Sequence, residues 1–168
     1  MHNLIHAKRK SFSLIELVTV IVALGVFSVA VVVSTDSAKV NKLIGAANKL
    51  MFDIRYAQQL ALSRHTDCGV SFDPASDTYF VYIGDTSTKA IDPHLRTEFM
   101  VDYTSESEYS GIDLVSTNFG DLISFDNIGT PYDSSAVELS SQGSVIIQTN
   151  SYTKNVTVQP STGKVKVQ

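Results

Sequence analysis

The hydrophobic residues of the chain follow three successive patterns. Residues 12–33 are apolar almost without interruption, and Glu16 is the one charged residue among them. Residues 34–65 contain no proline, and their apolar residues recur at steps of three and four. Beyond residue 65, apolar and polar residues alternate in short runs separated by turn-forming residues. The first two patterns are typical of α-helix and the third of β-strands, so the sequence predicts an α+β protein.

The helical patterns predict one long helix from about residue 12 to residue 64. Its first part (12–33) is apolar on all sides, as a segment buried in lipid or in a protein assembly must be. Its second part (34–65) has an apolar stripe on one face, and Asp53 is assigned to the polar side. The stripe consists of Val40, Leu43, Ile44, Ala47, Leu50, Met51, Ile54, Ala57, Leu60 and Ala61. Such a stripe needs a second layer of structure to cover it.

We expect that layer to be an antiparallel β domain over residues 66–168, packed on the helix. The alternating runs predict strands at 69–73, 78–83, 97–103, 112–116, 122–125, 136–139, 144–148, 154–159 and 164–167. Turn-forming residues predict tight connections at 127–129 and 160–163. Residues 85–96 and 104–111 have weak patterns and are predicted to be loops.

The apolar run has the length of a membrane-spanning helix, because about 20 apolar residues cross a hydrocarbon core of about 30 Å. It is longer than the apolar part of a secretory signal peptide, which has about 7–15 residues. The basic residues Lys8, Arg9 and Lys10 precede the run and should stay in the cytoplasm. We therefore predict a single-pass protein with its C-terminal domain outside the cytoplasm. Glu16 is then a costly charge in an apolar span, and such charges are usually functional.

The residues around Glu16 resemble the N-terminal motif of the type IV pilin family. Lys10-Ser-Phe-Ser-Leu-Ile-Glu-Leu17 is similar to the prepilin processing site, although Ser11 stands where the family favours glycine. The resemblance implies that residues 1–11 are a leader, that prepilin peptidase cuts between Ser11 and Phe12, and that Phe12 becomes the N-methylated first residue. It also implies that Glu16 neutralises the N-terminal amine of a neighbouring subunit. Such a pair would replace two isolated buried charges and set the axial register between helices.

The rest of the chain resembles one branch of that family, the minor pilins of the GspH/FimT type. Residues 52–64 are similar to the end of their long helix, and residues 123–131 and 156–165 are similar to their final strands. The resemblance implies a minor pilin or pseudopilin, held in the inner membrane and assembled near the tip of a type IV pilus or a type II secretion pseudopilus. Its partners would be prepilin peptidase, other pilins and the inner-membrane assembly platform.

No residue pattern indicates catalysis or a cofactor. His65 and His94 have no partner at a metal-ligand spacing, and the nine glycines are scattered singly. Cys68, the one cysteine, excludes an intramolecular disulfide, and we interpret it as a small buried residue at the start of a strand. Four acidic residues could hold calcium, but turn positions explain them better: Asp73, Asp77, Asp85 and Asp92. We therefore expect neither an enzyme nor a metal site.

Binding of nucleic acid is the alternative that the sequence leaves open. Some relatives of the FimT type bind DNA through a basic C-terminal tail, and here Lys154, Lys164 and Lys166 are the candidate contacts. The chain as a whole has 13 basic and 17 acidic residues, a net charge of −4. General binding to nucleic acid requires clustered positive charge. We therefore expect a structural subunit rather than a tip-located DNA receptor or adhesin.

Overall fold

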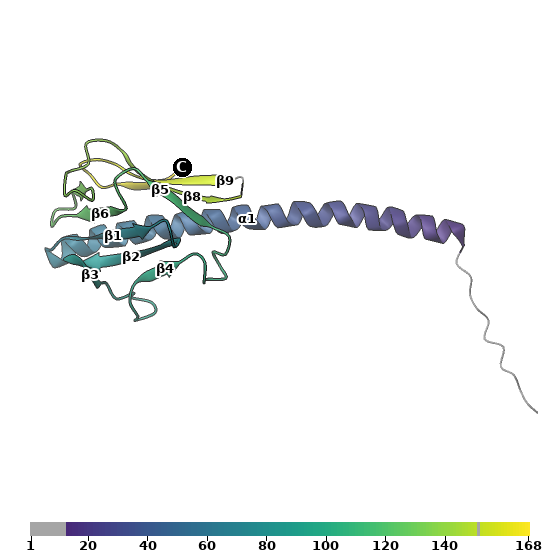
Figure 1. Cartoon of the computed structure of the whole chain (residues 1–168), viewed down its shortest axis with the longest axis horizontal. Helices are drawn as coiled ribbons and strands as arrows, with labels where there is room; N and C mark the ends of the chain where they lie inside the picture. The colour runs from purple at the N-terminus through teal and green to yellow at the C-terminus, as the bar shows by residue number, and fades with distance from the viewer. Residues whose placement is uncertain (1–12, 151) are drawn as a thin grey trace, which may run out of the picture. The chain divides into compact units, whose positions relative to one another are not determined.

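The computed structural model describes residues 13–150 and 152–168, without the side chains of residues 29–36. By its internal contacts the chain divides into residues 1–38 and residues 39–168. The predicted cleavage residues Ser11 and Phe12 lie outside the described residues. The elements in chain order are α1 (Leu14–Arg64), β1 (Cys68–Asp73), β2 (Thr78–Ile83), β3 (Asp85–Lys89), β4 (Met100–Asp102), β5 (Asp113–Thr117), β6 (Leu122–Phe125), β7 (Pro131–Tyr132), β8 (Gly143–Thr149), β9 (Tyr152–Val158) and β10 (Val165–Val167) (Figure 1).

The first turn and the last residue of helix α1 are both marked by the backbone. The amides of Glu16 and Leu17 donate to the carbonyl of Ser13. The helix then continues to Arg64, and His65 follows with a positive φ of 51°, a left-handed conformation that commonly stops a helix. Its extent confirms the single long helix that the periodicity predicts. No helix within the described part of the chain has an apolar stretch of the kind needed to cross a membrane.

The strands form two antiparallel sheets in residues 39–168. One has six strands in the order β3-β2-β1-β6-β7, with β4 also paired to β2, and the other has the order β10-β9-β8-β5. Figure 1 shows β6 and β3 on opposite sides of β1 and β2 in the first sheet. The predicted connections at 127–129 and 160–163 join the neighbouring pairs β6–β7 and β9–β10. The structure thus confirms an α+β fold built on antiparallel strands.

The core lies between the two sheets and the second half of α1. Leu43, Leu50 and Ile54 of the helix are almost completely buried, together with apolar residues from both sheets. This covers the helical stripe as predicted, with two corrections. Ile44, assigned to the stripe, is 40% exposed, and Asp53, assigned to the polar face, is 5% exposed.

Two of the predicted β-region assignments are also wrong. Residues 85–89, predicted as loop, form β3, because the backbone of this polar segment pairs with Tyr82 and Ile83 of β2. Residues 136–139, predicted as a strand, form a turn followed by one isolated bridge between Glu138 and Tyr132. The turn is stabilised by Asp133, whose carboxylate accepts the amides of Ser135 and Val137.

Candidate functional site

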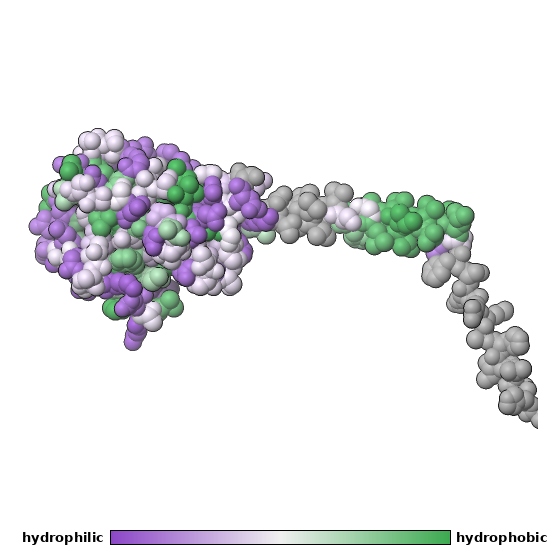
Figure 2. Space-filling view, in the orientation of Figure 1, coloured by the Kyte–Doolittle hydropathy of each residue, from purple (hydrophilic) through white to green (hydrophobic). Residues whose placement is uncertain are grey.

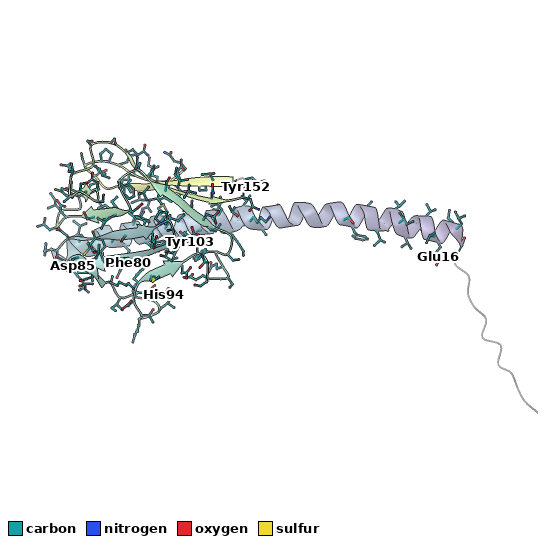
Figure 3. The ribbon with its side chains drawn as sticks, in the orientation of Figure 1. Glu16, Phe80, Asp85, His94, Tyr103 and Tyr152 are labelled. Atoms are coloured by element: carbon teal, nitrogen blue, oxygen red, sulfur yellow. The ribbon has the colours of Figure 1, made fainter. Side chains whose placement is uncertain are left out.

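The first described turns of α1 present an apolar surface with a single carboxylate. The apolar side chains between Leu14 and Phe27 are all exposed, as the green surface in Figure 2 shows. Glu16 lies at the start of this segment (Figure 3), and its carboxylate makes no hydrogen bond or ion pair with any described residue. An apolar helix surface of this size is typical of a segment that other molecules cover.

The three lysines singled out as candidate DNA contacts do not form one group. Lys164 precedes β10, and Lys166 in β10 pairs with Thr157 of β9, so these two exposed side chains lie on the same face of the sheet. Lys154 pairs with Ile147 and lies on the opposite face, toward the other end of β9. The structure therefore brings together two of the three lysines.

Three of the four candidate calcium ligands cap turns, and the fourth, Asp77, accepts the backbone amide of Leu114 in β5. Asp73 accepts the amide of Ala75 and Asp85 accepts that of Ser87, while Asp92 accepts the amide of His94. Hydrogen bonds from the hydroxyls of Ser76 and Ser87 lower the pKa of Asp73 and Asp85 respectively. Among the described residues, no three His, Cys, Asp or Glu side chains are grouped so as to hold a metal ion.

Cys68 is completely buried as the first residue of β1, which confirms its interpretation as a small buried residue. Burial raises the pKa of its thiol, and a buried protonated thiol is a poor nucleophile. His65 follows the end of α1, and His94 lies between β3 and β4 (Figure 3). The two histidines are thus on separate segments, and among the described residues no hydrogen bond joins either of them to Cys68.

A buried polar cluster joins α1 to β2. The hydroxyl of Tyr79 donates to Asp53 Oδ2 at 2.7 Å, and Lys49 Nζ lies 2.8 and 2.7 Å from the two oxygens of the same carboxylate. Lys49 also lies 4.8 Å from the ring centroid of Phe99. Desolvation by burial raises the pKa of Asp53, while the contacts with Lys49 and Tyr79 partly oppose that rise. The Lys49–Asp53 spacing of four residues is visible in the sequence, but the contact with Tyr79 is not.

Aromatic rings extend this cluster into the core. Tyr79 packs edge-on against Tyr103 with centroids 5.7 Å apart, and Tyr103 packs in the same way against Tyr109. Burial raises the pKa of all three phenols, that of Tyr109 to about 12. Tyr103 has a buried hydroxyl without a hydrogen-bond partner among the described residues. The rings therefore act mainly through packing, and among the described residues the hydrogen bond from Tyr79 to Asp53 links them to the helix.

A second polar contact fixes the helix to two turns. The side-chain amide of Gln58 donates to the carbonyl of Gly129, in the β6–β7 turn, at 2.9 Å and to that of Thr162, in the β9–β10 turn, at 3.1 Å. Arg55 donates from Nη2 to the carbonyl of Val165 in β10 at 2.6 Å. One turn of α1 is thus bound to both sheets.

Except for Val165, the residues that make these contacts lie within the part of the chain that matches a known family. The family of the type II transport protein GspH matches residues 46–162. The chain belongs to the GspH family. The matched range begins in the buried half of α1 and ends in the β9–β10 turn, so it includes Asp53, Gln58 and the turn carbonyls that Gln58 binds.

The fold is also similar to that of a solved pilin. Two crystal structures of the type IV minor pilin FimU from Pseudomonas aeruginosa match with TM-scores of 0.55 and 0.52 at 15% sequence identity. The first match covers 76% of this chain and 89% of FimU, and the second covers 75% and 92%. No curated protein matches the chain. The GspH-family chain therefore has a pilin-like fold.

Proposed function

We propose that this GspH-family protein is a minor pilin or pseudopilin that is assembled into a type IV pilus or a type II secretion pseudopilus. The observation that carries the proposal is the combination of the family match with the exposed apolar start of α1 and its lone carboxylate. An exposed helix of this composition needs a lipid or protein environment. The inner membrane would provide the lipid environment first, and the core of the filament would then provide the protein environment.

In this proposal Glu16 is the assembly residue. Prepilin peptidase cuts between Ser11 and Phe12, and the new amine of Phe12 is methylated. The amine then pairs with Glu16 of the neighbouring subunit while residues 12–33 leave the membrane, and residues 66–168 stay on the outer side. Pairing in apolar surroundings stabilises both charges, whereas either charge alone would be strongly unfavourable.

Mass spectrometry and filament fractionation test this proposal. The mature protein should begin at Phe12 and carry one added methyl group. Filaments sheared from the cells should contain the wild-type chain but not Glu16→Ala, while membranes contain both. The Thr19→Ala variant is the matched control, because it changes the same helical segment without removing the charge. Intact Met1, or normal entry of Glu16→Ala into filaments, would reject the proposal.

A DNA receptor at the filament tip is a second candidate function. The observation in its favour is that Lys164 and Lys166 are both exposed on the same face of the β9–β10 pair. Against it, residues 34–168 contain 10 basic and 16 acidic residues. We therefore retain the structural subunit as the conclusion.

A further inference from the structure

A pocket opens at the edge of the six-stranded sheet that is formed by β6 and β7. It has a volume of about 280 Å³, slightly below the range of about 300–1,000 Å³ that is typical of small-molecule sites. Its lining contains two carboxylates, two hydroxyls and no basic side chain: Asp67, Ser124, Asp126, Tyr132 and Ala136. The pocket therefore has room for a small polar group, and its charge favours a cation.

The two carboxylates of the pocket are available to bind a cation. Neither Asp67 nor Asp126 forms an ion pair with a basic residue of the described part of the chain. Oδ1 of Asp126 accepts the backbone amides of Ile128 and Thr130, while Oδ2 has a long contact of 3.4 Å with the hydroxyl of Tyr132. The turn thus holds this carboxylate in place, so its orientation does not have to change when a ligand binds.

Tyr82 brings a buried polar group to the same pocket. It is only 3% exposed, and it lies over Gly69, where an added Cβ would come 2.6 Å from the phenolic oxygen. Gly69 pairs with Tyr82 on one side and with Ser124 on the other, so the hydroxyl of Tyr82 points across β1 toward Ser124 in the pocket wall. Burial raises the pKa of Tyr82 to about 12, and a hydrogen bond from Ser124 partly opposes that rise.

The proton of the Tyr82 hydroxyl has no acceptor among the described residues, since Ser124 acts on this hydroxyl as a donor. Polar groups on buried side chains are nearly always paired, so an unused donor at a pocket points to a partner outside the chain. The pocket thus offers one neutral donor, from Tyr82, beside two negatively charged acceptors, Asp67 and Asp126. A ligand that uses all three has a cationic donor and a neutral acceptor close to it.

We propose that this pocket binds the free N-terminus of a peptide chain, with the α-ammonium group between Asp67 and Asp126 and the first carbonyl oxygen accepting the hydrogen bond of Tyr82. An α-amine and the carbonyl of its own residue are separated by one carbon atom, so one small pocket can bind both. A lysine or arginine side chain has a cation but no acceptor, and it leaves Tyr82 without a partner. This site is separate from the proposed assembly role, since it lies in residues 39–168 and does not include Glu16.

Binding of alanyl-alanine amide to the full chain in detergent tests this site. NMR spectra at about pH 6, below the usual α-amine pKa of about 7.7–8.0, should show saturable shifts of the backbone amide signals of Ser124 and Tyr132. A ligand of this size should have a dissociation constant in the millimolar range. N-acetyl-alanyl-alanine amide, which has no charged amine, should cause no saturable shift. n-Butylamine, which has the charge but no carbonyl, should bind about threefold to tenfold more weakly than alanyl-alanine amide.

Two substitutions that preserve the shape of the pocket test the two contacts separately. Asp67→Asn should weaken the binding of alanyl-alanine amide roughly tenfold, because it removes one of the two negative charges. Tyr82→Phe should lower the affinity for alanyl-alanine amide to about that for n-butylamine, and it should leave the affinity for n-butylamine unchanged. The matched controls are Asp113→Asn and Tyr152→Phe, which make the same chemical changes at exposed residues of the four-stranded sheet. Neither control should change binding.

The wild-type protein alone can already overturn the proposal. The absence of a saturable shift with alanyl-alanine amide, or equal binding of the acetylated peptide, would show that the pocket does not bind an N-terminus. Equally tight binding of n-butylamine, or an equal loss of both ligands in Tyr82→Phe, would show that the pocket accepts any amine. The buried thiol of Cys68 reports on folding, because it should remain unlabelled by a thiol reagent in every variant that is compared.

Discussion

The hydroxyl of Tyr79, on β2, donates a hydrogen bond to the buried carboxylate of Asp53, on α1, at 2.7 Å. The two residues are separated by 26 positions in the sequence. Their contact crosses the boundary between the helix and the six-stranded sheet, in a core that is mostly apolar. A charged group in such a place strongly disfavours any arrangement that leaves it without its partners.

Removing the Tyr79 hydroxyl should therefore destabilise the fold. We expect Tyr79→Phe to lower the free energy of unfolding by about 1–3 kcal/mol, because it leaves a buried carboxylate with one fewer donor. The rate at which Cys68 is labelled in increasing urea measures this loss, since the buried thiol becomes accessible when the β unit unfolds. Tyr152→Phe is the control, because Tyr152 is 45% exposed and its loss of a hydroxyl should change the stability little. Equal stability of the two variants would contradict the prediction.

The protonation of Asp53 should make its contribution to stability depend on pH. Burial raises the pKa of Asp53 in the folded protein above the ordinary value of 3.8, so the folded state binds a proton more tightly than the unfolded state. The protonated Asp53 then adds its full contribution to the free energy of unfolding below pH 3.8. This contribution is lost as the pH rises through the pKa of Asp53 in the folded protein. The free energy of unfolding of the wild type, minus that of Asp53→Asn, should fall over this window.

Urea unfolding of both proteins at a series of pH values measures that difference. The comparison with Asp53→Asn cancels the opposite effect of surface acids such as Asp102, whose pKa is lowered to about 2 by hydrogen bonds from Thr104 and Ser105. A difference that rises with pH would mean that the ion pair with Lys49 outweighs the desolvation of the carboxylate.

A side chain at Gly163 should interfere with the contact between Gln58 and the two turns. Gly163 has a φ of +61°, and an added Cβ would lie 2.3 Å from Gln58 Nε2 and 2.9 Å from the carbonyl oxygen of Gly129. Gly163→Ala should cost about 1–3 kcal/mol of unfolding free energy more than Gly111→Ala. Gly111 is the matched control, because its φ of +85° is also positive but nothing lies within 4 Å of an added Cβ. Cys68 labelling in urea measures both variants.

Binding to DNA should be weak and should not require Lys154. The described lysines form no large cluster, so we expect little retention of the full chain on duplex DNA at physiological salt concentration. Salt-sensitive retention that is lost in Lys164→Ala, Lys166→Ala but kept in Lys154→Ala would instead support the receptor function. Lys154→Ala is the control because its side chain lies on the opposite face of the sheet.

The periodicity of apolar residues predicts the helices and strands that bury one regular face of their own sequence. Helix α1 and strands such as β1, β2 and β8 have apolar residues at the spacing of the face that they bury. Strand β3 has no such signal, because Asp85–Lys89 is polar and becomes a strand only through pairing with β2. Residues 136–139 show the reverse case: their apolar and polar residues alternate as in a strand, but they form no strand, because Asp133 stabilises a turn there.

The contacts of the candidate sites were less predictable than the elements. Glu16 stands out in the sequence because a charge within an apolar run is costly. Asp53 does not, since an acid four residues after Lys49 is typical of a solvent-exposed helix face. Its burial depends on Tyr79, and the double contact of Gln58 depends on two turns more than 70 residues away along the chain. Sequence spacing contains no information on such distant partners.

The hydrogen bond from Arg55 to the carbonyl of Val165 spans 110 positions of sequence. During synthesis, the apolar stripe of α1 is made long before the strand that Arg55 holds. Strands β1 and β2 can cover part of the stripe early, but the contact with β10 forms only after nearly the whole chain has been made. Contacts between such distant segments also form slowly, because closing a long loop costs entropy before any contact compensates for it. The packing of α1 around Arg55 is therefore complete only after β10 has been synthesised.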